Sequence, residues 1–186
     1  MVLLSCLERS SLTIADEVNF EQSQVWSALH FIDDTVGIVV GGDEWFEGHM
    51  AFTIDGGKNW TFRQMGNKAL KGVTTNEQNW LAVGIDGYIY HGQILPEPAE
   101  GVFERQAFWE YLKDVIFLDQ NNLAIAVGGI GLNRGFVQQI ATDQWSSLAC
   151  DTLDRILEAV AQAPDGEIMA VGYGQVLSSK DLGLSW

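Results

Sequence analysis

The sequence predicts an all-β fold built from about four similar units. The dipeptide Val-Gly recurs at intervals of about 44 residues, a spacing typical of repeat proteins. Its copies are Val40-Gly41, Val83-Gly84, Val127-Gly128 and Val171-Gly172. Each copy ends a short apolar run bounded by Asp, Asn or Gly, as buried strands often are. Four short strands per repeat of this length indicate a β-propeller-like array of about four four-stranded antiparallel blades.

The other strands follow from their positions relative to Val-Gly. An apolar pair with two residues between its members precedes each mark and predicts a first strand, at Trp26/Leu29, Leu70/Val73, Leu112/Val115 and Leu157/Val160. Third strands are expected at 50–53, 88–90, 136–140 and 175–178, and fourth strands at 60–63, 102–105 and 145–148. Apolar residues also recur at helical spacing in Asp151–Ala161, which leaves a helix as the alternative there.

We expect a single domain over residues 1–186, with a partial blade at 1–22 and blades at about 23–66, 67–109, 110–150 and 151–186. The last blade lacks a fourth strand of its own. Asn19–Gln22 resembles the fourth strand of the first full blade and could complete the last one. Three arrangements remain open: a small ring of four or five blades, two chains that combine partial blades, or a fragment of a longer propeller.

Composition excludes several classes of partner. Ten Lys and Arg residues against 25 Asp and Glu give a formal net charge of -15, and this field repels nucleic acid and anionic lipid surfaces. Cys6 and Cys150 lack the spacing of a zinc site or redox pair and are expected to be buried thiols. The sequence has no signal-peptide pattern and no apolar run long enough for a membrane span, so a cytoplasmic protein without cofactors is expected.

Two eight-residue stretches share the pattern Ser/Thr-x-Asp-x-Gly-x-polar-Trp. The first contains Thr53, Asp55, Gly57 and Trp60, and the second contains Ser179, Asp181, Gly183 and Trp186. Asp can accept hydrogen bonds from turn amides, Gly permits a positive φ, and Trp can fold back on the turn. The pattern therefore indicates a structural turn and no catalytic carboxylate.

Both stretches resemble the Asp-box (BNR-type) motif, and the units around them are similar to the repeats of Asp-box β-propellers. That group includes sialidases and the photosystem II assembly-factor (Ycf48-like) propellers. The resemblance implies that the boxes lie between third and fourth strands, away from the ligand face. It says little about activity, because propellers host unrelated functions.

The stretch Gly42–His49 is predicted to be an insertion between the second and third strands of the first blade. Trp45 and Phe46, with Glu44 and His49 beside them, would form an aromatic platform with a polar rim on the ligand face. Arg134 and Tyr173 occupy the corresponding connections of the third and fourth blades. A metal site made by Asp43, Glu44 and His49 is the less favoured interpretation, and no metal is expected.

These patterns favour a non-catalytic binding or scaffolding module for a protein or peptide. The sequence contains no Ser-His-Asp elbow, phosphate loop or HExxH helix, so no catalytic residue is predicted. A carbohydrate-binding or glycoside-hydrolase-type propeller is the first alternative. A self-associating structural repeat, which could form a homo-oligomer through its incomplete terminal blades, is the second.

Overall fold

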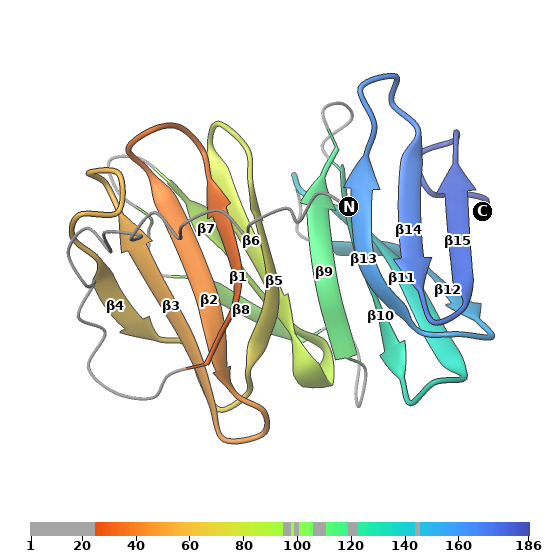
Figure 1. Ribbon diagram of the computed structural model, residues 1–186, viewed down its shortest axis with the longest axis horizontal. Coiled ribbons are helices and arrows are strands. Elements are labelled where there is room, and N and C mark those ends of the chain that lie inside the picture. The colour runs from red at the N-terminus through yellow and green to blue at the C-terminus, as the bar shows by residue number, and fades with distance from the viewer. Residues whose placement is uncertain (1–24, 95–97, 99–100, 106–110, 119–122, 144–145) are drawn as a thin grey trace, which may run out of the picture.

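The computed structural model describes residues 25–94, 98, 101–105, 111–118, 123–143 and 146–186. These residues form four antiparallel sheets that follow one another along the chain (Figure 1). Three sheets have four strands and the last has three. The prediction of an all-β, propeller-like array is confirmed. No helix in the described part of the chain is long and apolar enough to cross a membrane.

The first two blades correspond to the first two repeats. Blade 1 has the order β1 (Trp26–Phe31), β2 (Gly37–Asp43), β3 (Glu47–Thr53) and β4 (Thr61–Gln64). Blade 2 has the order β5 (Leu70–Thr75), β6 (Asn79–Gly84), β7 (Tyr88–Gln93) and β8 (Val102–Arg105). A single 3-10 turn, η1 (Ile85–Gly87), joins β6 to β7.

The last two blades continue the pattern. Blade 3 has the order β9 (Tyr111–Phe117), β10 (Leu123–Ile130), β11 (Arg134–Ala141) and β12 (Ser146–Leu153). Blade 4 has β13 (Leu157–Gln162), β14 (Ile168–Gly172) and β15 (Gln175–Ser179). β12 and β13 occupy most of Asp151–Ala161, so the helical alternative is wrong. The apolar spacing there arises because one strand ends and the next begins within the segment.

The partial blade expected over residues 1–22, including the strand expected at Asn19–Gln22, lies outside the described residues. Blade 4 therefore has three described strands, and β15 is the last in its sheet. How the array closes stays a prediction.

A β-bulge recurs at one position in the first strand of every blade. In blade 3, Gly128 pairs with Leu112 and Val127 pairs with Asp114, so Lys113 is the extra residue. The same skip occurs in the other three blades, where the extra residues are Ser27, Lys71 and Glu158. Such a bulge bends the strand and redirects the unpaired side chain.

The glycine of each Val-Gly pair lies opposite this bulge. A Cβ atom on Gly128 would lie 1.8 Å from the carbonyl oxygen of Tyr111, and one on Gly172 would lie 1.9 Å from that of Ile156. The equivalent distances are 2.0 Å at Gly41 and 2.3 Å at Gly84. Only glycine lets the first strand approach the second so closely. The Val-Gly repeat is therefore the sequence signature of the bulge.

Each pair of neighbouring blades encloses its own apolar core. The core between blades 1 and 2 is built around Trp80, which is fully buried. The core between blades 2 and 3 includes Leu81 and Ile140, and that between blades 3 and 4 includes Val127 and Leu157. Side chains on both faces of a central blade are thus buried, as expected for blades that stack.

The two Ser/Thr-x-Asp turns have nearly the same hydrogen bonds. Thr53 Oγ1 donates to Asp55 Oδ1 at 2.8 Å, the Asn59 amide donates to the same oxygen at 2.9 Å, and Trp60 Nε1 donates to the Gly57 carbonyl at 3.0 Å. In the second turn, Ser179 and Ser185 make the equivalent bonds to Asp181. The first turn joins β3 to β4, and the second follows β15. Their assignment to the Asp-box family stays a prediction.

We predict that Gly128→Ala lowers the free energy of unfolding by about 3 kcal/mol or more, because the new methyl group would overlap a backbone carbonyl that cannot move independently of β9. Urea denaturation measures this change. Gly166→Ala is the control, since no atom lies within 4 Å of its added Cβ and only its φ of +89° is unfavourable. The control should lose about 1 kcal/mol. Equal losses would show that the close approach is not what requires glycine.

We predict that both turns lose stability in acid. Hydrogen bonds from Asn59 are the main cause that lowers the pKa of Asp55 to about 2, and those from Ser185 lower the pKa of Asp181 to about 2. Because the folded-state pKa lies below the unfolded value of 3.8, the contribution is present above that value and disappears as the pH falls toward 2.

The double variant Asp55→Asn/Asp181→Asn should therefore be less stable than the parent at pH 7. The difference should shrink between pH 4 and pH 2, as followed by thermal unfolding monitored by circular dichroism. A difference that stays constant over this range would show that the carboxylate charge is not what stabilises the turns.

Candidate functional site

The four bulges surround one hollow at the centre of the array. The hollow has a volume of about 460 Å³ and is lined by Ser27, Glu44, Lys71, Tyr111, Lys113 and Glu158. We call these six residues the channel mouth. Four of them are the bulged residues of β1, β5, β9 and β13, one from each blade. The repeat thus brings together side chains that are far apart in the sequence.

Opposite charges meet around the channel mouth. Lys71 Nζ lies 2.9 Å from Glu44 Oε1, and Lys113 Nζ lies 2.7 Å from Glu158 Oε1. Both pairs join neighbouring blades. The lysine side chains are 24% and 29% exposed and the glutamates 53% and 51%, so all four remain accessible to a ligand. The site therefore presents two positive and two negative side chains. This arrangement suits a partner that carries both kinds of charge, and it does not form the purely positive pocket that would favour a phosphate.

The predicted insertion Gly42–His49 is instead the end of a long hairpin, and this prediction was wrong. β2 continues to Asp43 and β3 begins at Glu47, with Gly42 opposite Gly48, so only residues 44–46 form the turn. Gly42 makes the hairpin possible because a Cβ there would lie 2.0 Å from the Glu47 carbonyl oxygen. The hairpin of blade 3 has an equivalent three-residue turn at 131–133.

Trp45 and Phe46 have different environments in this turn. Trp45 packs edge-on against Tyr111 with ring centroids 5.6 Å apart, and the Lys68 ammonium lies 5.1 Å from its ring centre. Trp45 therefore supports the position of Tyr111 at the channel mouth. Phe46 is 75% exposed and is the aromatic residue of the pair that is available to a partner.

His49 does not belong to the exposed face. It is 5% exposed, lies within β3, and its ring contacts Phe62 at 5.1 Å and Trp26 at 6.3 Å. Its Nε2 atom lies 3.2 Å from Glu47 Oε1. Glu44 pairs with Lys71 instead, so Asp43, Glu44 and His49 are not assembled as a metal site. The part of the chain that the structure describes contains no group of three or more His, Cys, Asp and Glu side chains that could hold a metal.

Arg134 and Tyr173 are both exposed at turns on the same face as the channel mouth. Arg134 begins β11, and its guanidinium lies 5.1 Å from the ring centre of Phe136. Tyr173 lies between β14 and β15 and is 56% exposed, and its amide donates to the carbonyl of Ile156, just before β13. In Figure 1 the β2–β3 and β10–β11 turns lie along the lower edge of the array.

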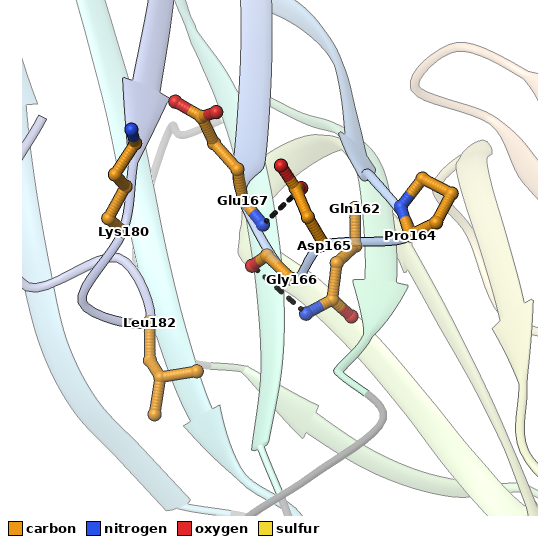
Figure 2. A pocket seen from close by; sticks show the side chains of 7 residues that line it. All are labelled: Gln162, Pro164, Asp165, Gly166, Glu167, Lys180 and Leu182. Carbon is orange, nitrogen blue, oxygen red and sulfur yellow. Dashed lines mark hydrogen bonds between the residues drawn. The ribbon is translucent and has the colours of Figure 1, made fainter.

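A second hollow of about 550 Å³ lies beside the β13–β14 turn, at the far end of blade 4 (Figure 2). Its polar groups already serve the turn: the Glu167 amide donates to Asp165 and Gln162 Nε2 donates to the Gly166 carbonyl. Lys180 and Leu182 of the second Ser/Thr-x-Asp turn form its other wall. We assign no ligand to this hollow because these contacts explain its residues.

The perturbed carboxyl group next to the channel mouth has a structural role. Burial raises the pKa of Asp114, and its two oxygens accept amide hydrogen bonds at 2.9 Å from Val115 and from Val160 of the next blade. Asp114 thus ties blade 3 to blade 4. Burial also lowers the pKa of His91, with an opposing contribution from Glu104. Neither group faces the hollow.

The sequence prediction selected residues of the hairpin turns and missed five of the six channel-mouth residues, namely Tyr111 and the four bulged residues. Ser27, Lys71, Lys113 and Glu158 each follow directly after the first apolar residue of the first-strand pair. Comparing the four repeats at that position would have revealed a polar or charged residue in every copy. Glu44 was predicted as a binding residue at the rim of an aromatic platform, whereas the structure pairs it with Lys71.

Comparisons with known proteins support the fold. No protein-family model matches the chain, and a search of curated proteins found no match. Among solved structures, a chain described as YCF48 bound to D1 peptide, which is a β-propeller, matches with a TM-score of 0.58 and 16% sequence identity. The match covers 87% of this chain and 53% of that one, so this chain spans about half the length of the similar chain. At this identity the likeness shows a propeller-like fold alone.

We predict that Trp45→Ala lowers the free energy of unfolding by about 1–2 kcal/mol, because it removes the contacts with Tyr111 and Lys68. Phe46→Ala should change it by no more than about 0.5 kcal/mol, since the side chain is largely in solvent. Urea denaturation of both variants provides the comparison. If Phe46→Ala lowers the free energy of unfolding more than Trp45→Ala does, the structural role assigned to Trp45 is wrong.

Proposed function

We propose that this chain is a non-catalytic binding or scaffolding module that holds a protein or peptide at the channel mouth. The observation that supports this proposal is the hollow of about 460 Å³ that all four blades line. Its two ion pairs and Tyr111 combine charged and aromatic contacts, and Phe46, Arg134 and Tyr173 extend that chemistry along the same face. Interfaces with proteins and peptides are enriched in these aromatic and Arg side chains.

The similar solved chain also supports a peptide partner, because it is described as bound to a peptide. A peptide presents backbone polar groups together with side chains of either charge. The alternating Lys and Glu residues of the mouth can exchange their mutual ion pairs for such groups. An exposed ion pair contributes only about 0–1 kcal/mol, so this exchange costs little.

Carbohydrate binding or glycoside hydrolysis stays the alternative function. Hydrolysis commonly uses two facing carboxyl groups, one of which has a raised pKa. Glu44 and Glu158 each have a lysine partner, and Asp114, with its raised pKa, holds two backbone amides. No observation on the described residues favours this alternative over peptide binding.

Selection from a random phage-displayed peptide library tests the proposal. We expect peptides that bind the parent chain to lose at least about tenfold in affinity to the double variant Phe46→Ala/Lys113→Ala, because a truncated aromatic contact and a lost charge contact each cost about 1 kcal/mol or more. Lys58→Ala is the matched control, since Lys58 is an exposed lysine in the turn between β3 and β4. It should bind as the parent does.

Two results would contradict the proposal. Equal losses for the mouth variant and for Lys58→Ala would place binding elsewhere on the surface. Turnover of any substrate in a screen of chromogenic glycosides would support the enzymatic alternative instead. A glycan array with the parent chain distinguishes binding of sugars without turnover.

A further inference from the structure

The contact between neighbouring blades has two complementary faces. We call the face that a blade presents to the next blade its front face and the face that it presents to the preceding blade its receiving face. The valine of Val-Gly is on the front face, together with the residue two positions before it. In blades 1 to 3 these side chains are all 0% exposed, as measured for Ile38, Val40, Leu81, Val83, Ile125 and Val127.

The receiving face is built around the second residue of the first-strand apolar pair. In blades 2 to 4 this residue is Val73, Val115 or Val160, with exposures of 6%, 2% and 6%. The three apolar cores each join a front face to a receiving face. The same complementary contact therefore occurs three times in one chain.

Among the described residues, each terminal blade exposes apolar side chains on the face that meets no other blade. On the front face of blade 4, Met169 is 43% exposed, Val171 is 42% exposed and Val176, which pairs with Val171, is 65% exposed. On the receiving face of blade 1, Leu29 of β1 is 57% exposed and Phe62 of β4 is 44% exposed, while Val39 and Ala51 between them are 9% and 0% exposed. Exposed apolar side chains gathered on one face of a sheet can mark an interaction site.

We propose that the front face of blade 4 binds the receiving face of blade 1 of a second copy of this chain. Every other front face in the described residues meets a receiving face, so the surface is shaped for a blade of this same repeat. The sheet of blade 1 and the sheet of blade 4 lie toward opposite ends of the long axis in Figure 1. The matching face in the same copy therefore does not cover it.

This contact is heterologous, because different surfaces of the two copies meet. Two copies can satisfy both of their free faces through two such contacts related by a twofold axis. The interface consists of blade faces and does not require exchange of a strand. The proposal is also independent of what binds at the channel mouth.

Sedimentation velocity of the whole chain over a range of concentrations is the first test. We expect a species of about twice the 20.5 kDa chain mass, and a larger fraction of it in 0.5 M salt than in low salt, because each copy carries a formal charge of -15. A mass of 20.5 kDa at every concentration would overturn the proposal.

Two variants test the faces separately. Val171→Asp disrupts the front face of blade 4, and Leu29→Asp disrupts the receiving face of blade 1. In a dimer of either variant, the new aspartate would be buried at both contacts between the two copies. The dissociation constant of the dimer should therefore rise by about tenfold or more. Leu132→Asp is the control, because Leu132 is 60% exposed in the β10–β11 turn and lies on neither face.

Mixing the two variants distinguishes this contact from others. A Val171→Asp copy keeps an intact receiving face and a Leu29→Asp copy keeps an intact front face, so the mixture regains one undamaged contact. We expect dimers to reappear on mixing. Dimers that survive Val171→Asp alone, or a mixture that stays monomeric, would contradict the proposed geometry.

Thermal unfolding of each variant shows whether the substituted chain still folds. The substituted side chains are 42% exposed at Val171, 57% at Leu29 and 60% at Leu132, so the melting temperatures of the monomeric variants should be similar to that of Leu132→Asp. If Val171→Asp fails to fold, Val176→Asp changes the same face at its most exposed residue. The mixing experiment is then performed with that variant.

Discussion

The close approach of the first and second strands in every blade determines much of this molecule. A backbone carbonyl at the start of the first strand occupies the space where a side chain would begin on the second strand, so that position must be glycine. The bulge that accompanies this approach turns one side chain of each first strand toward the centre. One backbone constraint thus explains the Val-Gly repeat, the curvature of the inner strands and the position of the candidate site.

The turns at the two ends of the array differ in their chemistry. At one end, the bulged residues and the β2–β3 turn form a charged and aromatic mouth. At the opposite end, the Ser/Thr-x-Asp turns satisfy their own backbone groups with side-chain oxygens. Between them, apolar faces of successive blades provide the stability. Lysines are few in this acidic chain, yet Lys71 and Lys113 both lie at the mouth, where each forms an ion pair with a glutamate.

Particular residues show how far the sequence could be interpreted. The strand at Leu157–Gln162 was predicted correctly against its helical pattern, because the other repeats have a strand in that position. Gly42–His49 was misinterpreted as an insertion, since the pairing of Asp43 with Glu47 across a tight turn depends on a conformation of Gly42 that no pattern reveals. His49 looked like a ligand-binding residue, but strand alternation places it among Trp26 and Phe62.

The sequence by itself determined the all-β class, the number of units and the location of nearly every strand, because period and alternation are local properties that survive without knowledge of the fold. It also determined which polar side chains could support the turns. Only the tertiary structure decided which residues meet. Ser27, Lys71, Lys113 and Glu158 come together because four bulges face one axis, and Trp45 supports Tyr111 because blades 1 and 3 meet there. Contacts between distant segments depend on how blades stack, and stacking is not encoded in any single repeat.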